Sequence, residues 1–291
     1  MSVFTSLQST ASKTSTYGHL QENGRLAISI LTDDLMRQGF WGELSGNLDF
    51  SSLESVPDML GGDCVGEGIN NRSFPLSIGH FRALWGQTAE SQNLLSCISN
   101  AKAESDVIQI KRVVSSSITA SAIDDDKYYL ISNMNSGAIF KGTEAVPTMD
   151  YGNIWEYQHH IYYVKEKTIN GNKVPILVQG RLLNTSSVIW FDEVIDGIEM
   201  IRFSYGVDTD ADGVVNAFIP ADNMTTLYWD SSDILAVKIY VLVRDIYPDN
   251  NYENENSYQV GNTIVEGNND NYHRLLMSST VTLFNARTDK W

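Results

Sequence analysis

Apolar residues near the start of the chain recur at helical spacing and predict one amphipathic helix. The residues that share the apolar face, at spacings close to three or four positions or their multiples, are Leu20, Ala27, Ile28, Leu31 and Leu35. Gly39 and Gly42 then supply a stop signal. We therefore expect a helix within residues 3–40, with its apolar side covering another part of the fold.

The following segment, residues 41–100, shows no regular period. It is rich in glycine and asparagine, at Gly61-Gly62, Gly66, Gly68 and Asn70-Asn71. These residue types favour turns and loops. We expect long loops here rather than extended helices or strands.

From residue 105 onward, short runs of β-branched and aromatic residues alternate with turn signals and predict strands. The runs are residues 107–114, 127–132, 160–164, 174–181, 188–191, 200–205, 236–244 and 275–284. Asn170-Gly171 predicts a tight hairpin between two of them, because Asn and Gly tolerate the positive φ angles of such turns. Residues 236–244 alternate apolar and polar positions, which is typical of a half-buried strand.

One helix followed by many strands predicts an α+β fold, in which a long N-terminal amphipathic helix packs on an antiparallel β-sheet with long loops. The length of 291 residues fits one large domain or two small ones. The sequence contains no internal repeat and no clear linker between domains. We therefore expect one domain that includes the helix.

The acidic balance of the chain limits its partners. There are 36 acidic and 20 basic residues, and the formal net charge is -16. The electric field of this negative charge repels phosphate backbones, so nucleic acid is not an expected partner. No apolar run approaches the roughly 18 residues that a membrane-spanning helix requires, so the chain as given is expected to be soluble.

An acidic loop carries the sharpest chemical motif of the sequence. Asp208, Asp210 and Asp212 offer oxygen ligands at alternate positions and are followed by Gly213. A loop of this kind can curl around a hard cation such as calcium, with the carbonyl of Val214 as a further ligand. These residues are therefore a candidate calcium site.

The motif is not a complete EF-hand loop. The ninth position is Asn216, and the twelfth is Ile219 where an EF-hand has a bidentate Glu. A calcium site would need a carboxylate from elsewhere, such as Asp222. A solvated turn between two strands explains the same residues without a metal, and both interpretations remain open.

The two cysteines also leave two interpretations open. Cys64 and Cys97 are 33 positions apart and have no metal-binding spacing around them. They fit either a disulfide or two independent thiols, because the choice depends on the redox state of the compartment.

The sequence contains no recognisable catalytic motif. There is no nucleophile elbow, no phosphate-binding glycine loop and no dinucleotide fingerprint. His159 and His160 are neighbours on a predicted strand and should face opposite ways, which does not favour a metal site. We therefore expect no enzymatic activity and no small-molecule substrate.

Several segments, in order along the chain, together resemble the PilW-like minor pilins of type IV pili. They are residues 20–27 (LQENGRLA), 34–35, 39–42 (GFWG), 105–108 with 111–112, 160–164, 196–199, 205–210, 272–274 and 278–285. Family members usually have an arginine directly after the Asp-Leu pair, whereas here Met36 precedes Arg37. The segments span nearly the whole chain.

The resemblance implies a pilin-like fold. Residues 1–40 would be the C-terminal part of the long pilin helix, without its membrane-spanning start, and residues 41–291 a β-rich globular pilin head. The full-length protein would be anchored in the inner membrane facing the periplasm and would reach the pilus tip at the cell surface after assembly. Since the periplasm is oxidising, the resemblance also implies a Cys64–Cys97 disulfide.

The implied function is that of a non-enzymatic minor pilin that helps to initiate type IV pilus assembly in the tip complex. Its partners would be other minor pilins and pilus tip or assembly proteins. An adhesin-like binding module is one alternative, and a type II secretion minor pseudopilin of the GspJ kind is another. The acidic loop and the closing segment, residues 272–274 and 278–285, resemble PilW-like pilins more than GspJ-like pseudopilins.

Overall fold

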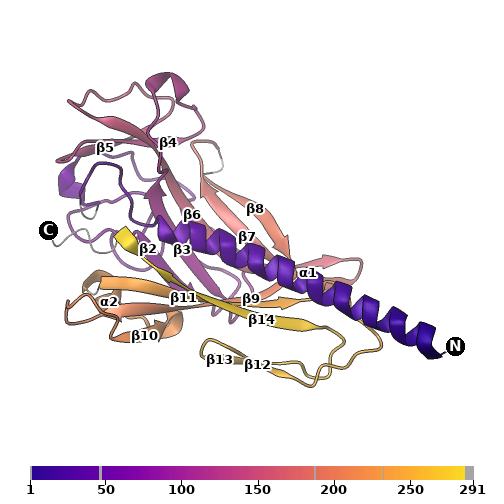
Figure 1. Ribbon diagram of the computed structural model, residues 1–291. Coiled ribbons are helices and arrows are strands. Elements are labelled where there is room, and N and C mark those ends of the chain that lie inside the picture. Colours follow the sequence, from indigo (N-terminus) through magenta and orange to yellow (C-terminus); the bar gives the residue numbers. More distant parts are fainter. Residues whose placement is uncertain (1, 46–47, 187, 232, 286–291) are drawn as a thin grey trace.

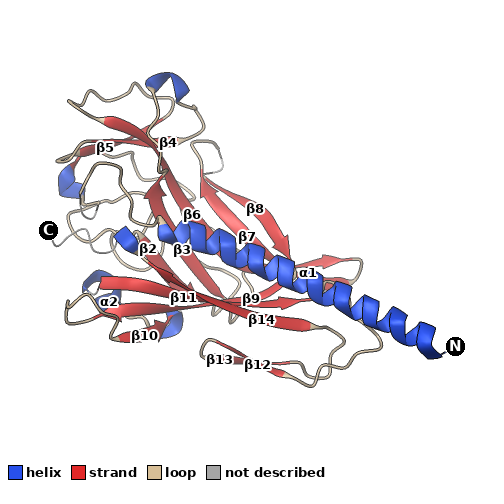
Figure 2. Cartoon of the chain, viewed as in Figure 1, coloured by secondary structure: helices blue, strands red, loops and turns tan. Residues whose placement is uncertain are grey.

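The computed structural model describes residues 2–45, 48–186, 188–231 and 233–285, with side chains of the N-terminal helix described from Tyr17 onward. The described chain is mostly β. It contains fourteen strands in three sheets and two α-helices, α1 (Ser2–Met36) and α2 (Thr226–Ser231) (Figures 1 and 2).

The expected α+β fold, with one long helix packed on one antiparallel sheet, is therefore wrong. The strands divide among several sheets, and one pair in the largest sheet is parallel. The described packing of α1 involves only residues 17–36. The expectation failed because several short strands lack a sequence pattern, and because adjacency along the chain does not reveal how strands divide among sheets.

The largest sheet has eight strands. They are β1 (Leu53–Ser55), β2 (Leu84–Thr88), β3 (Asp106–Val113), β4 (Tyr128–Ser132), β5 (Gly137–Lys141), β6 (Asn153–Ile169), β7 (Asn172–Leu182) and β8 (Ile189–Asp196). Their main order is β1-β5-β4-β6-β3-β2, with β7 between β6 and β8. The long strand β6 holds the sheet together, because it pairs with β4 near its start, with β3 in its middle and with β7 toward its end.

The second sheet has the order β10-β9-β11-β14. Its strands are β9 (Ile198–Asp208), β10 (Ala217–Pro220), β11 (Asp233–Arg244) and β14 (Arg274–Thr282). The hairpin of β12 (Ser257–Val260) and β13 (Thr263–Glu266) forms the third sheet. Three short 3-10 helices complete the described elements, at Phe50–Ser52, Ala120–Ala122 and Ala221–Asn223, the last of which is η3.

The expected hairpin at Asn170-Gly171 is confirmed as the turn between β6 and β7. Asn170 has φ 50° and Gly171 has φ 82°, and the flanking residues Ile169 and Asn172 are paired. Positive φ at both central residues gives the turn a twist that matches the two strands.

The expected apolar face of α1 is also confirmed. Leu20, Ala27, Leu31 and Leu35 are buried and Ile28 is partly buried, and the helix lies against β14 and β11 (Figure 1). At Gly24 the helix approaches the sheet so closely that an added Cβ would lie 2.5 Å from the Met277 sulfur. A side chain at this position would therefore require the flexible Met277 side chain to move.

The expectation of a half-buried strand at residues 236–244 is only partly correct. Val237, Ile239 and Val241 are fully buried on one face, but Leu242 on the other face is fully buried as well. The β12–β13 hairpin covers that second face through Val260, which packs with Leu242 in a small apolar cluster. The sequence pattern of β11 alone did not reveal this cover.

The loop-rich segment from residue 41 to 100 is packed rather than loosely attached. Trp41 and Phe74 are buried and contact the ring of Tyr157 on β6, with centroid distances of 5.9 and 5.4 Å. These buried aromatic rings attach the segment to the sheet, although few of its residues lie in helices or strands.

No helix in the described part of the chain is both long and apolar enough to cross a membrane.

Candidate functional site

The predicted calcium loop connects β9 to β10 at the end of the four-stranded sheet. Two bonds close its base: the Asn216 N–H donates to the Val207 carbonyl at 2.9 Å, and the Asn216 side-chain oxygen accepts the Thr209 N–H at 2.6 Å. These two bonds continue the antiparallel pairing of β9 and β10 into the base of the loop. Sequence analysis treated Asn216 only as a poor EF-hand ligand and missed its part in closing the loop.

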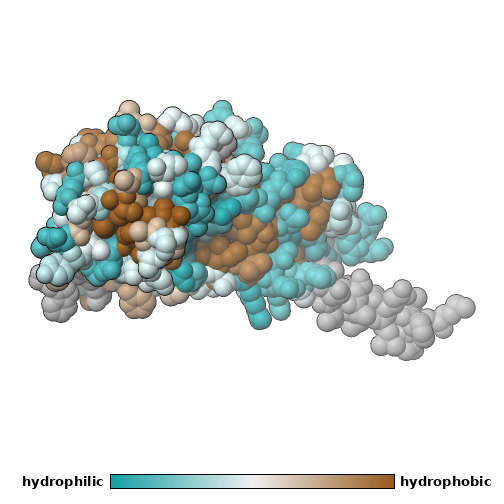
Figure 3. Space-filling view, turned by 90° about the horizontal axis from the view of Figure 1, so that it is seen from above, coloured by the Kyte–Doolittle hydropathy of each residue, from teal (hydrophilic) through white to brown (hydrophobic). Residues whose placement is uncertain are grey.

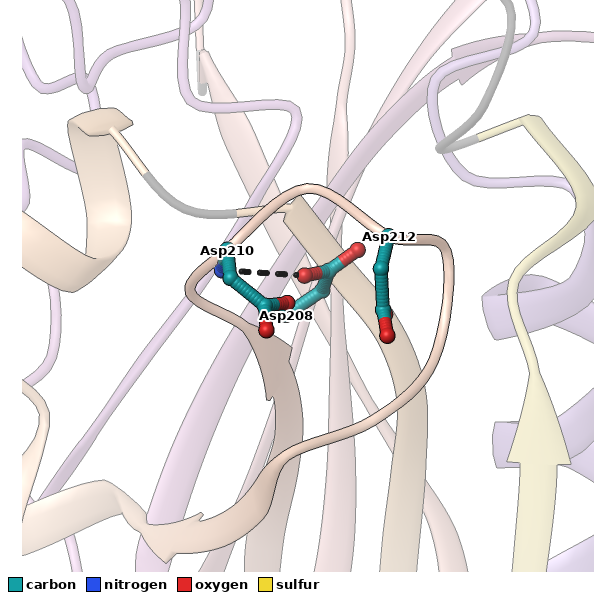
Figure 4. A group of neighbouring side chains, drawn as sticks. All are labelled: Asp208, Asp210 and Asp212. Carbon is teal, nitrogen blue, oxygen red and sulfur yellow. Dashed lines mark hydrogen bonds between the residues drawn. The ribbon is translucent and has the colours of Figure 1, made fainter.

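The structure brings Asp208, Asp210 and Asp212 together. One carboxylate oxygen from each lies within 4.8 Å of the others (Figure 4). Asp208 is buried, whereas Asp210 and Asp212 are exposed. Three oxygen ligands at this separation can share one hard cation after small side-chain rotations.

Asp208 organises the curl of the loop. Its carboxylate accepts the N–H groups of Asp210, Ala211 and Gly213 at 3.2, 2.7 and 2.7 Å. Ala211 and Gly213 have φ angles of 62° and 83°, which turn the backbone N–H groups inward. Burial raises the pKa of Asp208, but the N–H groups of Gly213 and Ala211 lower it more, so that its pKa lies below the ordinary value.

Val214 and Asp222 were the other predicted ligands. The Val214 N–H donates to the Asp212 carboxylate at 2.8 Å, and its side chain is exposed. Asp222 lies on η3 and forms an ion pair with Arg202 at 2.9 Å, and it is not in the group of three aspartates. Any further ligand for a cation would therefore come from backbone carbonyls, water or a partner.

The structure contains the disulfide between Cys64 and Cys97. Cys64 is fully buried, and next to it the Val65 N–H donates to the Leu95 carbonyl at 2.8 Å. The bond joins the loop after β1 to the segment after β2, so it fastens two irregular stretches to each other.

A shallow groove of about 470 Å³ runs between α1 and the edge strand β14. The helix contributes Arg25, Ile28, Ser29, Thr32, Asp33 and Met36, and the strand contributes Met277, Ser278 and Ser279. The hydroxyl of Thr32 is buried here and has no hydrogen-bond partner among the described residues. In the described sheet, β14 has a neighbouring strand on only one side, so its other edge can accept one.

A second cleft, of about 370 Å³, lies between β2 and the η3–α2 segment. Its lining includes the carboxylates Glu67, Glu90 and Asp222. Trp85 and Trp229 also line it but are buried, so their faces do not form an exposed stacking platform. Elsewhere on the surface, seen from above, apolar residues gather in separate patches divided by hydrophilic ones (Figure 3).

The expectation for the two adjacent histidines is confirmed. His159 Nδ1 lies 2.9 Å from the Ser73 hydroxyl, whereas His160 Nδ1 lies 2.6 Å from an Asp34 oxygen. The two rings therefore point to opposite faces of β6 and do not form one site.

Residues 161–285 match the family model described as Type IV Pilus-assembly protein W. The matched stretch runs from within β6 to just beyond β14 and includes the acidic loop. The family is a component of pilus assembly and not a known family of enzymes. No curated protein and no solved structure matches the chain.

Proposed function

We propose that this protein is a PilW-like minor pilin that acts without enzymatic activity to initiate type IV pilus assembly. The match of residues 161–285 to the assembly-protein family is the observation that carries the proposal. In this proposal the full-length protein is anchored in the inner membrane and faces the periplasm before it joins the pilus tip. Anchoring restricts the subunits to a plane, which raises their effective concentration and allows modest interfaces to assemble.

The groove between α1 and β14 is the surface that fits a partner pilin best. It combines apolar side chains, including Ile28 and Met277, with small hydroxyl side chains that let a second backbone approach. A partner that covers these apolar side chains removes them from water, and this burial contributes to affinity.

We expect the Ser29→Glu and Ser278→Glu variants to bind the periplasmic domains of neighbouring minor pilins about tenfold more weakly or worse. The introduced carboxylate would lose its water on binding without gaining a partner, at a cost of about 1 to 3 kcal/mol. Affinity measured by surface plasmon resonance checks this, and piliation of cells that carry each variant checks its consequence.

Ser116→Glu is the matched control, because Ser116 is exposed in the loop after β3 and lies outside the groove. It should bind as the wild type does. If the wild-type domain bound none of the minor pilins, the assembly role would be contradicted. Binding to glycans or host surfaces by the isolated domain would then favour the adhesin-like alternative, and binding only to secretion pseudopilins the GspJ-like one.

We also propose that Asp208, Asp210 and Asp212 bind calcium. The support is geometric: one carboxylate oxygen from each aspartate lies within 4.8 Å of the others, in a loop that the N–H groups around Asp208 hold curled. Without a bidentate glutamate the site should be weak, with a dissociation constant on the order of 0.1 to 1 mM, as in extracellular calcium modules.

Calorimetry on chelator-treated protein is expected to show calcium binding that the Asp210→Ala, Asp212→Ala double variant abolishes. Calcium should also raise the Tm of the wild type but not of this variant, since a ligand stabilises the state that binds it. An Asp124→Ala, Asp125→Ala variant alters a different acidic turn and should bind normally. A titration without heat and without a shift in Tm would remove calcium from the proposal.

A further inference from the structure

Lys111 on β3 is a lysine in an unusual environment. Its side chain is fully buried, and its Nζ donates to the Asn71 side-chain oxygen at 3.0 Å and to the Arg82 carbonyl at 2.7 Å. The ring of Phe81 lies 5.2 Å from the same nitrogen. No carboxylate in the described chain lies within ion-pair distance of it, although lysine is almost never fully buried unless it is paired.

The environment of Lys111 favours the neutral amine. Burial is the main cause that lowers the pKa of Lys111 to about 7; the charge of Asp63 opposes it, and the Arg82 guanidinium adds a smaller lowering effect. A neutral amine uses its N–H groups as donors and keeps one lone pair. A buried amine with a free lone pair is a nucleophile.

His159 lies directly opposite Lys111 on the neighbouring antiparallel strand β6. The Ser73 hydroxyl lies 2.9 Å from His159 Nδ1 and donates to the Asp63 carboxylate at 2.7 Å. Since a carboxylate only accepts, Ser73 uses its proton on Asp63 and accepts the Nδ1–H of His159. This assigns the lone pair of the neutral imidazole to Nε2.

His159 Nε2 is therefore a base nitrogen on the same side of the sheet as the Lys111 amine. It is buried and has no hydrogen-bond partner among the described residues. Burial holds the pKa of His159 well below its ordinary value. In this structure Nε2 is not hydrogen-bonded to the Lys111 amine, whose partners are Asn71 and the Arg82 carbonyl.

Asn71 supplies the carboxamide that faces this amine. It is fully buried, and its Nδ2 donates to the Glu67 carbonyl at 3.0 Å, which holds Oδ1 toward Lys111. Cγ, the carbon bonded to Oδ1, is the electrophilic atom of the group. Fixed proximity lowers the barrier for the reaction of an amine with an amide.

We propose that Lys111 and Asn71 form an intramolecular isopeptide bond that joins β3 to the loop between β1 and β2. The lone pair of Nζ attacks Cγ of Asn71, and the bond from Cγ to Nδ2 breaks. The proton that Nζ loses passes to the departing nitrogen, which leaves as ammonia. One amide replaces another, so no oxidant or reductant is needed.

The isopeptide bond would act together with the disulfide. Asn71 and Cys64 lie in the same loop, and their partners Lys111 and Cys97 lie on either side of the turn that leads into β3. The loop would then be fixed at two points, one of which reductants do not break.

Intact mass spectrometry of the full chain, purified under native conditions and then denatured and reduced, tests the proposal. The expected mass is that of the sequence less one ammonia, and digestion should give an Asn71 peptide joined to a Lys111 peptide. The Lys111→Met and Asn71→Ala variants should each show the mass calculated from their own sequence, with no loss of ammonia. The wild-type measurement decides the question even if a variant fails to fold.

A succinimide at Asn170-Gly171 would also remove one ammonia, so the controls must separate the two products. The Asn170→Ser variant should keep the ammonia deficit, and so should Lys167→Met, which alters an exposed lysine. A deficit that persists in Lys111→Met would overturn the proposal. Full sequence mass in the wild type, with Asn71 and Lys111 recovered in separate linear peptides, would overturn it as well.

Discussion

Replacing Asp34 by Ala is expected to lower the free energy of unfolding by about 3 to 5 kcal/mol. Asp34 lies on α1, and its side chain is only 4% exposed. One oxygen lies 2.6 Å from the Arg112 guanidinium, and the other lies 2.6 Å from both His160 Nδ1 and the Tyr162 hydroxyl. Its removal would leave the buried Arg112 charge without a partner and would break the polar link between α1 and the eight-stranded sheet.

The same carboxylate should make stability depend on pH. Burial raises the pKa of Asp34, but the hydrogen bond from His160 and the charges of His160 and Arg112 lower it more, to well below the ordinary value. A group with a lowered pKa in the folded state stabilises above its unfolded pKa of about 3.9 and loses that contribution as pH falls. The Asp34→Asn variant should therefore lose less stability than the wild type between about pH 5 and pH 2.

Asp33→Ala is the matched control for Asp34→Ala. Asp33 is the adjacent residue, about half exposed, and pairs with Arg37 on the helix surface at 2.7 Å. Exposed pairs of this kind contribute about 0 to 1 kcal/mol. Urea unfolding of the three proteins, followed by circular dichroism, gives the comparison. Equal losses in Asp33→Ala and Asp34→Ala would contradict a special role for the buried carboxylate.

Asp33 and Asp34 differ in how far along the sequence their partners lie, and only nearby partners can be predicted from the sequence. The period of the helix located its apolar face, and the Asp33–Arg37 pair is a contact within one helix at i,i+4 spacing. Nothing in the local sequence showed that Asp34 meets Arg112 and His160, because those partners lie 78 and 126 positions away. Long-range polar contacts depend on the tertiary fold, which the helix period does not encode.

Lys111 and Arg112 make the same point within one strand. From the sequence they form a short basic cluster, but the structure buries both. Lys111 bonds to Asn71 and Arg112 to Asp34, because successive side chains of a strand point to opposite faces. The predicted strand at residues 107–114 located the pair correctly, and the period of two could have separated their environments.

Several of the shortest strands were the least predictable part of the fold. Short strands such as β2, β5, β10 and the β12–β13 hairpin have four or five residues each, too few for a period to stand out. The acidic loop was predictable, because its aspartates and glycine are adjacent in sequence and fold locally. Its closure by Asn216 was not apparent, since Asn at the ninth position was read against the EF-hand pattern alone.

The disulfide carries the second large prediction. Replacing Cys64 by Ala and Cys97 by Ser together is expected to lower the free energy of unfolding by about 3 to 4 kcal/mol. The bond closes a loop across 33 positions, and without it the unfolded chain gains the freedom of that loop. The loss should be large because the bridged segment has few strand hydrogen bonds of its own.

Wild-type protein unfolded in the presence of a reductant is the control for the double variant, because reduction removes the bond without changing the packing around Cys64. Both samples should unfold at a similar urea concentration, well below that of the oxidised wild type. If reduction left the transition unchanged, the packing of Trp41 and Phe74 against Tyr157 would be sufficient to hold the segment. The disulfide would then contribute little to the stability of the domain, contrary to the loop-closure argument.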